Sequence, residues 1–329
     1  MDFSQLMALS SGHVEARIVQ SAVELKIFDA LETSPLSAAA LASALQLNEA
    51  ALELLLNALA AVNLLDKRGG NFFLTEIARK HLLHSSPQYL GGMIGFDAML
   101  WKAWEKLPDA IRTGRPARPP DMYQADSSET EVFISAMDSL VKARGDGEVL
   151  ASAMDWSNVA TLLDVGSGPA SYPIALCQRF PQLRATIVDL PGTLKITERF
   201  VTEAKLAQRI ARIPADYRSD PNPGNYDAIF LSNIVHGENF ARNAALISKL
   251  AKNLNPGGHL IVKDHILDDS RATPPVGAIF SLLMLLSTDG GRCYSFTEIA
   301  TWMNQAGLKR VERIDLPAPL TSSLVIGTR

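Results

Sequence analysis

An acidic residue followed by a glycine turn lies near the middle of the chain, in the stretch LLDVGSGPASY over residues 162–172. The apolar residues before the turn predict a buried strand, and the residues after it predict the start of a helix. Gly166 and Gly168 allow the backbone to turn tightly and to approach a ligand closely, while a helix start offers free N–H groups. We therefore predict a ligand-binding turn, against the alternative of a plain strand-to-helix connection.

Two carboxylates indicate which ligand this turn binds. Asp189 ends the next predicted strand, where a carboxylate can accept hydrogen bonds from both hydroxyls of a ribose. A dinucleotide fingerprint requires glycine at its sixth position to seat a pyrophosphate, and this chain has Ser171 there. Asp164 would repel a pyrophosphate, but it suits the cationic amino-acid end and the sulfonium of S-adenosylmethionine. These residues favour S-adenosylmethionine, with a nicotinamide cofactor as the alternative.

A histidine follows a later strand of the same region. The stretch FLSNIVHGENF places His236 just past an apolar run, where ligands bind at the carboxyl edge of such sheets. An imidazole with a pKa of about 6.5 can take the proton of a phenol with a pKa of about 10 as the O–CH3 bond forms. A sulfonium is already an activated leaving group, so alignment and deprotonation are the main tasks of the protein. We predict that His236 is a general base, against the alternative of a solvated loop histidine.

The elements that must position these residues alternate between strand and helix from Thr161 onward. Helical text separates the apolar runs TLLDV, RATIVDL, RIARIPA, YDAIFLS and HLIVKDHI. This alternation predicts an α/β fold with a Rossmann-like, doubly wound and mostly parallel sheet. The carboxyl rim of that sheet is the predicted ligand site.

The first part of the chain predicts a separate helical domain. Ser37 and Asn48 precede two apolar helices as caps, and Gly69-Gly70 interrupts two short apolar runs as a hairpin turn. Helix, helix, helix and hairpin is the order of a winged helix. The third helix, EAALELLLNALAAV, contains no lysine or arginine, which favours burial in a partner interface over DNA reading.

Length and composition limit the remaining classes of function. A chain of 329 residues predicts two domains, and a net charge of −4 argues against a general nucleic-acid or anionic-membrane partner. The most apolar segment, VGAIFSLLMLL, is too short to span a bilayer, and the N-terminus does not resemble a signal peptide. Cys177 and Cys293 are far apart, which indicates a reduced cytoplasmic compartment.

Taken together, these stretches resemble the class I S-adenosylmethionine-dependent methyltransferases. More narrowly, they resemble the O-methyltransferases of the plant caffeic acid, animal acetylserotonin and bacterial polyketide or phenazine type. ELKIFDAL, LLNALAAVNLLDKRGGNFFLTEIARKHLL and LWKAWEKLPDAIRTGRP are similar to the family's dimerisation domain. LLDVGSGPASYPIALCQRFPQLRATIVDLP, NPGGHLIVKDHIL and MLLSTDGGRCYSFTEIATWMNQAGL are similar to its catalytic domain.

The resemblance implies an architecture and a reaction. It implies a winged-helix-like dimerisation domain over residues 1–110, a helical connector over 111–156 that contributes to the substrate pocket, and a cofactor-binding catalytic domain over 157–329. The implied enzyme is a homodimer that uses S-adenosylmethionine to methylate a hydroxyl of a small aromatic or polyketide-like metabolite. C- or N-methylation, or a non-methylating reaction on the same fold, is the alternative, and a DNA-binding regulator with S-adenosylmethionine as effector is a lesser one.

The resemblance also implies roles for single residues around the cofactor. From the methionine part through the ribose to the adenine, the implied cofactor residues are Asp164, Gly166, Gly168, Asp189, Leu190, Asp216, Tyr217 and Ser232. Plant members have a lysine where this chain has Ser232, so we expect that adenine contact to be weak or absent.

The family flanks its catalytic histidine with two acids, and this chain departs from that pattern. Asp264 can fill one position, while the other falls on Cys293, which does not orient an imidazole as a carboxylate would. Glu238 and His265 are both candidates to compensate, and the sequence does not choose between them.

Other polar and apolar side chains have weaker implications. Three apolar side chains at helical spacings are candidates for walls of the acceptor pocket, with a plain core role as the alternative: Met137, Phe280 and Met284. Arg292 is expected to be a loop charge rather than an anchor for a substrate carboxylate. His81 and His84 form an HxxH pair on a predicted helix, but they have no acidic or cysteine partner pattern, so we predict no metal site.

Overall fold

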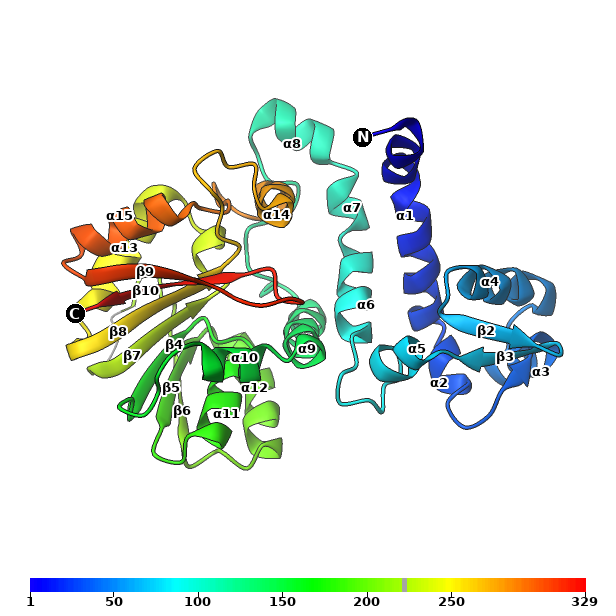
Figure 1. The fold of residues 1–329 in the computed structure, drawn as a ribbon, viewed down its shortest axis with the longest axis horizontal. Helices are drawn as coiled ribbons and strands as arrows, with labels where there is room; N and C mark the ends of the chain where they lie inside the picture. Colours follow the sequence, from blue (N-terminus) through cyan, green and yellow to red (C-terminus); the bar gives the residue numbers. More distant parts are fainter. Residues whose placement is uncertain (221–223) are drawn as a thin grey trace. The chain divides into compact units, whose positions relative to one another are not determined.

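The computed structural model describes residues 1–220 and 224–329 of the chain. The backbone divides into two compact units, whose elements are labelled in Figure 1. The N-terminal unit consists of Met1–Leu100 with Ser135–Ala143, and the C-terminal unit of Trp101–Ile134 with Arg144–Arg329. The connector predicted over 111–156 is therefore divided between the two units.

Helices and a small sheet make up the N-terminal unit. Its elements up to residue 100 are α1 (Phe3–Glu24), α2 (Ile27–Ala30), β1 (Leu36–Ser37), α3 (Ala38–Leu45), α4 (Glu49–Ala61), β2 (Leu65–Arg68), β3 (Asn71–Leu74), α5 (Glu76–His81) and α6 (Gly91–Met99). The side chains of Ser37 and Asn48 accept hydrogen bonds at the starts of α3 and α4, so both predicted caps are confirmed. The predicted hairpin is also present, because β2 and β3 pair antiparallel in a sheet of order β1-β3-β2.

One expectation for this unit is wrong. Helix α5 ends at His81, so His84 lies beyond the helix and the two histidines do not share it. Ser85, Ser86 and Pro87 follow, and residues of these types favour turns over helix.

The C-terminal unit contains the alternating strands and helices. Its elements are α7 (Trp101–Trp104), α8 (Leu107–Thr113), α10 (Asp146–Ala153), β4 (Thr161–Val165), α11 (Ser171–Arg179), β5 (Arg184–Asp189), α12 (Pro191–Glu203), β6 (Ile210–Pro214), β7 (Tyr226–Ser232), η1 (Val235–Gly237), α13 (Phe240–Ala251), β8 (Leu254–Asp264), α14 (Pro275–Ser287), α15 (Phe296–Gln305), β9 (Lys309–Asp315) and β10 (Ser323–Thr328). Helix α9 (Ser127–Arg144) has residues in both units.

The seven strands of the C-terminal unit form one mostly parallel sheet in the order β6-β5-β4-β7-β8-β10-β9. The five predicted strands, β4 to β8, pair in parallel, so the predicted α/β fold is confirmed. Strands β9 and β10 are antiparallel to their neighbours and were not predicted. The edge strand β9 is largely exposed, because an edge strand does not need the continuous apolar run of a buried parallel strand.

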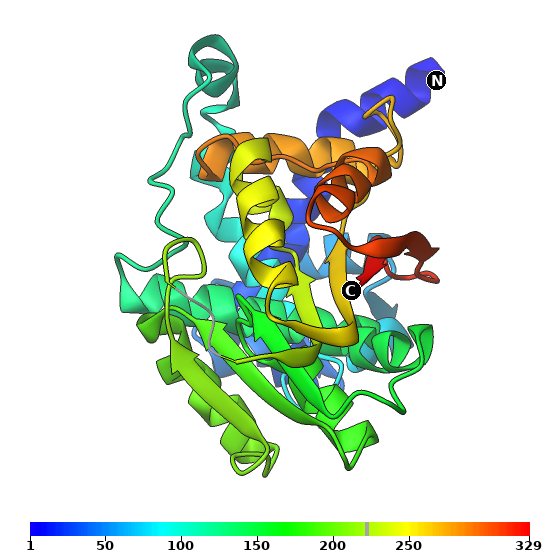
Figure 2. The same ribbon diagram turned by 90° about the vertical axis from the view of Figure 1, so that its left-hand side faces the viewer.

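Helices cover both faces of this sheet. Figures 1 and 2 show α13 and α15 on one face and α11 and α12 on the other. The order of the strands reverses at β4, because β5 pairs on one side of it and β7 on the other. Such a switch point opens a crevice at the carboxyl ends of the strands, which is where the predicted site residues lie.

Within the described ranges, no single helix is both long and apolar enough to cross a membrane; only α3 and α4 pass that test together, as a pair bent by 116°.

Candidate active site

The glycine turn after β4 requires glycine at its first position. Gly166 and Gly168 have φ of +67° and +56°, in the left-handed region that favours glycine. A Cβ on Gly166 would lie 2.3 Å from Cδ1 of Ile234 and 3.7 Å from Cε1 of Tyr217. The turn therefore passes close to two side chains of later segments, and a larger residue would fill the narrow space beside it.

Asp189 fastens this turn to the end of β5. Its Oδ2 accepts the main-chain N–H of Gly168 at 2.8 Å, and its Oδ1 accepts that of Leu190 at 2.7 Å. Thr197, on α12, donates from its hydroxyl to the carbonyl of Gly168 at 2.6 Å. Burial raises the pKa of Asp189, while these backbone bonds oppose the shift. Each carboxylate oxygen keeps a lone pair that can accept a ribose hydroxyl.

Asp164 is a buried acid beside the same turn. Its Oδ2 accepts the hydroxyl of Ser167 at 2.6 Å, and burial raises its pKa to about 7. A nearby cation would favour the charged form of this carboxylate. A left-handed glycine cradle, a buried acid and a carboxylate at the end of β5 together fit S-adenosylmethionine, whose sulfonium and ammonium groups are cationic.

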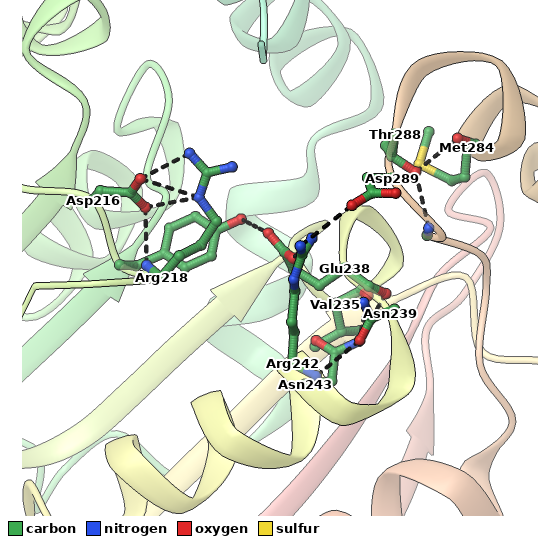
Figure 3. A network of polar contacts seen from close by, with 12 residues as sticks. Asp216, Arg218, Val235, Glu238, Asn239, Arg242, Asn243, Met284, Thr288 and Asp289 are labelled. Atoms are coloured by element: carbon green, nitrogen blue, oxygen red, sulfur yellow. Dashed lines mark hydrogen bonds and ion pairs between the residues drawn. The ribbon is translucent and has the colours of Figure 1, made fainter. Parts of the chain in front are cut away.

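The two predicted adenine residues after β6 have different surroundings. Arg218 donates to the carboxylate of Asp216 from Nε at 2.9 Å and from Nη2 at 2.7 Å, and these bonds lower the pKa of Asp216 (Figure 3). Tyr217 lies beside Gly166, and its hydroxyl donates to Oε1 of Glu238 at 3.3 Å. Ser232 is the last residue of β7 and pairs in register with Lys263.

His236 lies on η1, the short helical turn that follows β7. Its side chain is buried, and its Nδ1 lies 2.8 Å from Oδ1 of Asp264, the last residue of β8. The main-chain N–H of His236 donates to Oδ2 of the same carboxylate at 3.3 Å. Burial alone would raise the pKa of Asp264, but the charge and hydrogen bond of His236 hold that pKa below its usual range. The arrangement assigns the proton to Nδ1 and leaves the lone pair on Nε2.

Buried polar side chains hold the turn that carries His236. Asn243, on α13, donates from Nδ2 to the carbonyls of Val235 at 2.7 Å and Glu238 at 3.2 Å. The hydroxyl of Tyr294 also donates to the carbonyl of Glu238, at 2.7 Å. Sequence reasoning missed both residues, because neither belongs to a motif with His236.

The two candidates to assist His236 differ in their contacts. The carboxylate of Glu238 contacts Tyr217 and Arg242 rather than the imidazole ring. His265 donates its main-chain N–H to Oδ1 of Asp264 at 2.7 Å, and its Nδ1 lies 3.0 Å from the carbonyl of Thr321. Burial lowers the pKa of His265. His265 is therefore the candidate that shares Asp264 with the base.

Phe280 lies between the two histidines. Its ring centroid is 4.8 Å from that of His236 and 5.0 Å from that of His265, edge to face in both cases. Met284 is buried one turn further along α14, whereas Met137 belongs to the N-terminal unit. Phe280 is thus the acceptor-pocket candidate in direct contact with the predicted base.

Cys293 and Arg292 precede α15. Burial raises the pKa of the Cys293 thiol to about 12, so it carries no charge with which to stabilise an imidazolium. Arg292 donates to Glu298 at 3.1 and 2.7 Å and stacks over the ring of Tyr294. This engagement fits the expected loop charge rather than a substrate anchor.

A buried ion cluster near the end of β8 was not predicted. Nζ of Lys263 lies 3.4 Å from Oδ2 of Asp146, which also accepts Arg144 at 2.7 Å and the hydroxyl of Tyr172 at 2.9 Å. The only sequence signal is a lysine inside the apolar stretch LIVKDHI.

Among the residues that the structure describes, no group of three or more His, Cys, Asp or Glu could hold a metal ion.

Comparison with known proteins identifies the two parts of the chain. Residues 104–309 match the O-methyltransferase domain, and residues 7–84 match the O-methyltransferase dimerisation domain. The chain is 30% identical to 3-hydroxy-5-methyl-1-naphthoate 3-O-methyltransferase of Streptomyces sahachiroi, over 98% of this chain and 94% of the relative. It is 29% identical to the tetracenomycin polyketide synthesis 8-O-methyl transferase of Streptomyces glaucescens, over 98% and 96%.

A solved structure agrees with the fold throughout. Human N-acetylserotonin methyltransferase in complex with SAM superposes with a TM-score of 0.90 at 22% identity, covering 100% of this chain and 98% of that one. This match confirms the predicted fold class. The family match and the relatives confirm the methyltransferase activity, and with it S-adenosylmethionine as the cofactor of the family. The chain belongs to the S-adenosylmethionine-dependent O-methyltransferase family and has that family's dimerisation domain at its N-terminal end.

Proposed function

We propose that this enzyme methylates a hydroxyl of a small aromatic or polyketide-like metabolite, with His236 as the general base. One observation carries the assignment: the buried His236 has its Nδ1 bound to Asp264 at 2.8 Å. In residues 1–220 and 224–329, no protein group hydrogen-bonds to Nε2, so this lone pair is available for a proton. Relatives named for a hydroxynaphthoate and a polyketide support the class of acceptor.

The residues around His236 have separate roles in the proposed methyl transfer. When bound, S-adenosylmethionine supplies a methyl group on a positively charged sulfur. Nε2 of His236 takes the proton of the acceptor hydroxyl, and Asp264 fixes the tautomer and stabilises the imidazolium that results. The ring of Phe280 excludes water from one side of the imidazole.

The roles proposed for the cofactor residues follow those that the sequence implied. We propose that Asp164 faces the cationic end, that both oxygens of Asp189 accept the ribose hydroxyls, and that Leu190 and Tyr217 contact the adenine. Asp216 has less to offer the adenine than expected, because Arg218 occupies its carboxylate. Ser232 and Met137 stay predictions without a contact that supports them.

A methyl-transfer assay tests the proposal. Phenols, hydroxynaphthoates and polyketide hydroxyls would be offered with S-adenosylmethionine, and product mass and NMR would separate O- from C- or N-methylation. His236→Ala should lower kcat by roughly 10²–10⁴-fold and leave the affinity for S-adenosylhomocysteine unchanged. Wild-type turnover by this variant would remove His236 as the base, and a C- or N-methylated product would change the reaction.

We also propose a homodimer formed through the N-terminal unit. The dimerisation domain matched over residues 7–84 supports this, and α1 exposes a run of apolar side chains: Phe3, Leu6, Met7, Leu9 and Val14. Light scattering should give twice the chain mass of 35.6 kDa, and a monomer would contradict the proposal.

Two further proposals concern the N-terminal unit and the compartment. The helix and hairpin order of this unit supports the winged-helix description. Two buried, unpaired cysteines fit a reduced cytoplasmic compartment.

A further inference from the structure

A buried carboxylate lies two residues after the predicted base and takes no part in the proton transfer. The side chain of Glu238 is only 6% exposed. Its Oε1 accepts the hydroxyl of Tyr217 at 3.3 Å, and its Oε2 lies 3.5 Å from Nη1 of Arg242 (Figure 3). Burying a carboxylate is costly unless it has partners, so these few contacts decide what Glu238 does.

The contact with Arg242 is the weaker of the two. Arg242 is 51% exposed, and it also pairs with Asp289, which is 70% exposed. Solvent screening leaves the exposed Arg242–Asp289 pair worth little, and Oε2 of Glu238 makes no hydrogen bond to Arg242 at 3.5 Å. Tyr217, by contrast, is half-buried, and burial of its phenol together with the charge of Glu238 raises the pKa of that group. Tyr217 therefore stays protonated and donates a hydrogen bond to the carboxylate.

Two side chains hold the main chain of Glu238. Its carbonyl accepts bonds from Asn243 and Tyr294, which also fix the turn of His236. The backbone from which the carboxylate reaches the Tyr217 hydroxyl is therefore fixed in place.

The Tyr217 ring packs against the hydrophobic core but also borders a cavity. A cavity of about 210 Å³ is lined by Tyr217, Arg218, Glu238, Arg242, Leu246 and Lys249. This cavity is open to solvent, so on that side the ring faces water rather than closely packed protein atoms. On another side, the same ring lies beside the glycine turn, where Cε1 is 3.7 Å from the position of a Cβ on Gly166.

We propose that Glu238 is a positioning residue for the cofactor: by accepting the Tyr217 hydroxyl, it holds the tyrosine ring against the glycine turn. The inference rests on the proposed place of Tyr217 beside the adenine. It assigns no proton transfer to Glu238, which separates its role from that of His236. The hydrogen bond supplies the constraint that packing leaves incomplete at the cavity.

A double-mutant cycle tests this role. The variants are Tyr217→Phe, Glu238→Leu and the pair together, with the dissociation constant of S-adenosylhomocysteine measured by calorimetry. Each single change should weaken binding about 5- to 10-fold, and the double variant should be no weaker than the worse single one, because both remove the same bond. KM for S-adenosylmethionine should rise while kcat at saturation stays within about twofold, as expected for lost uniform binding.

Conservative and control variants separate positioning from general damage. Glu238→Gln keeps an acceptor oxygen and should restore near wild-type affinity. Glu198→Gln removes an exposed acid that pairs with Arg212 outside this network, and it should bind the ligand as the wild type does. Should Glu238→Leu fail to fold, Tyr217→Phe and Glu238→Gln, which conserve volume, still test the bond.

Three outcomes would overturn the inference: wild-type affinity in Tyr217→Phe, additive losses in the double variant, or a Glu238→Gln loss as large as that of Glu238→Leu. Asp189→Ala distinguishes a failure of the proposed site from a failure of this inference. If Asp189→Ala also leaves ligand affinity unchanged, the cofactor site itself is misplaced. If only Asp189→Ala weakens binding, the site holds and Glu238 has no positioning role.

Discussion

Nδ1 of His236 lies 2.8 Å from Oδ1 of Asp264, and Oδ2 of that carboxylate accepts the main-chain N–H of His236 at 3.3 Å. One acid therefore fixes both the ring and the backbone of the predicted base. Strand β7 leads into η1 and strand β8 ends at Asp264, so the pair joins neighbouring strands at the carboxyl rim of the sheet. The alignment of the imidazole ring depends on this carboxylate, while Asn243 and Tyr294 hold the turn that carries it.

Replacing Asp264 by Asn should lower turnover more than cofactor binding. An amide is neutral and does not stabilise the imidazolium formed on proton transfer, so we expect kcat to fall by roughly 10²-fold or more. The loss should shrink at high pH, where a phenolic acceptor with a pKa of about 10 ionises without a base. Steady-state rates from pH 6 to 10 would check this, and a kcat that matches wild type at pH 7 would contradict it.

His265 should affect the acceptor more than the base. Only the main-chain N–H of His265 reaches Asp264, and a side-chain substitution preserves that bond. The imidazole instead contacts Phe280, with ring centroids 5.0 Å apart. His265→Ala should therefore raise KM for the acceptor about 3- to 10-fold, the size expected for a lost aromatic contact, with the pH profile of kcat unchanged. A shifted pH profile would instead make His265 part of the proton transfer.

Asp164 should make the unliganded protein less stable as pH rises. Burial raises its pKa to about 7, above the value of about 3.9 expected in the unfolded chain. Between these values the folded state keeps a proton that the unfolded state releases, so stability falls from about pH 4 to pH 7. Asp164→Asn removes this term, and its Tm should exceed that of wild type by a few degrees at pH 8 and by little at pH 4.

The same substitution should remove cofactor affinity. An amide at position 164 offers no charge to a cationic ligand, so S-adenosylhomocysteine and S-adenosylmethionine should both bind more weakly, the cationic sulfonium ligand by the larger factor. Calorimetry with the two ligands makes the comparison. Equal losses of affinity for both ligands would place the sulfonium away from Asp164. In the stability experiment, a Tm difference between Asp164→Asn and wild type that does not change with pH would contradict the claim that Asp164 is protonated in the folded protein.

The central strands and the glycine turn were predictable because their physical causes are local. Strands β4 and β7 are buried and read as apolar runs, and the turn needs residues that tolerate positive φ. The place of Asp189 at the end of β5 was also predictable, since strand ends meet at one rim. Strand β9 escaped prediction because its exposed edge consists mostly of charged residues, KRVERID, rather than of an apolar run.

The contacts that complete the site were not predictable from one sequence. Asn243 and Tyr294 hold the His236 turn from α13 and from the segment before α15, and the bond from Tyr294 spans 56 residues. Which side chains meet across such distances depends on how helices pack on the sheet. The choice between Glu238 and His265 had the same origin, because it depends on which of them reaches Asp264: the main-chain N–H of His265 does, whereas the carboxylate of Glu238 contacts other side chains.

Alanine substitutions at Gly166 and Gly69 separate two effects: the backbone strain of a positive φ, and the crowding of the glycine turn by a neighbouring side chain. Both Gly166 and Gly69 have positive φ, but a Cβ on Gly166 would lie 2.3 Å from Ile234, whereas nothing lies within 4 Å of one on Gly69. Alanine should cost about 1–2 kcal/mol of unfolding free energy at Gly69 from strain alone, and more at Gly166, where Ile234 must also move. Only Gly166→Ala should weaken S-adenosylhomocysteine binding, by at least about 10-fold, because the displaced Ile234 and the new methyl group narrow the cradle. Denaturant unfolding and calorimetry on the two variants provide the test: equal destabilisation with unchanged ligand affinity would mean that the turn does not approach the cofactor.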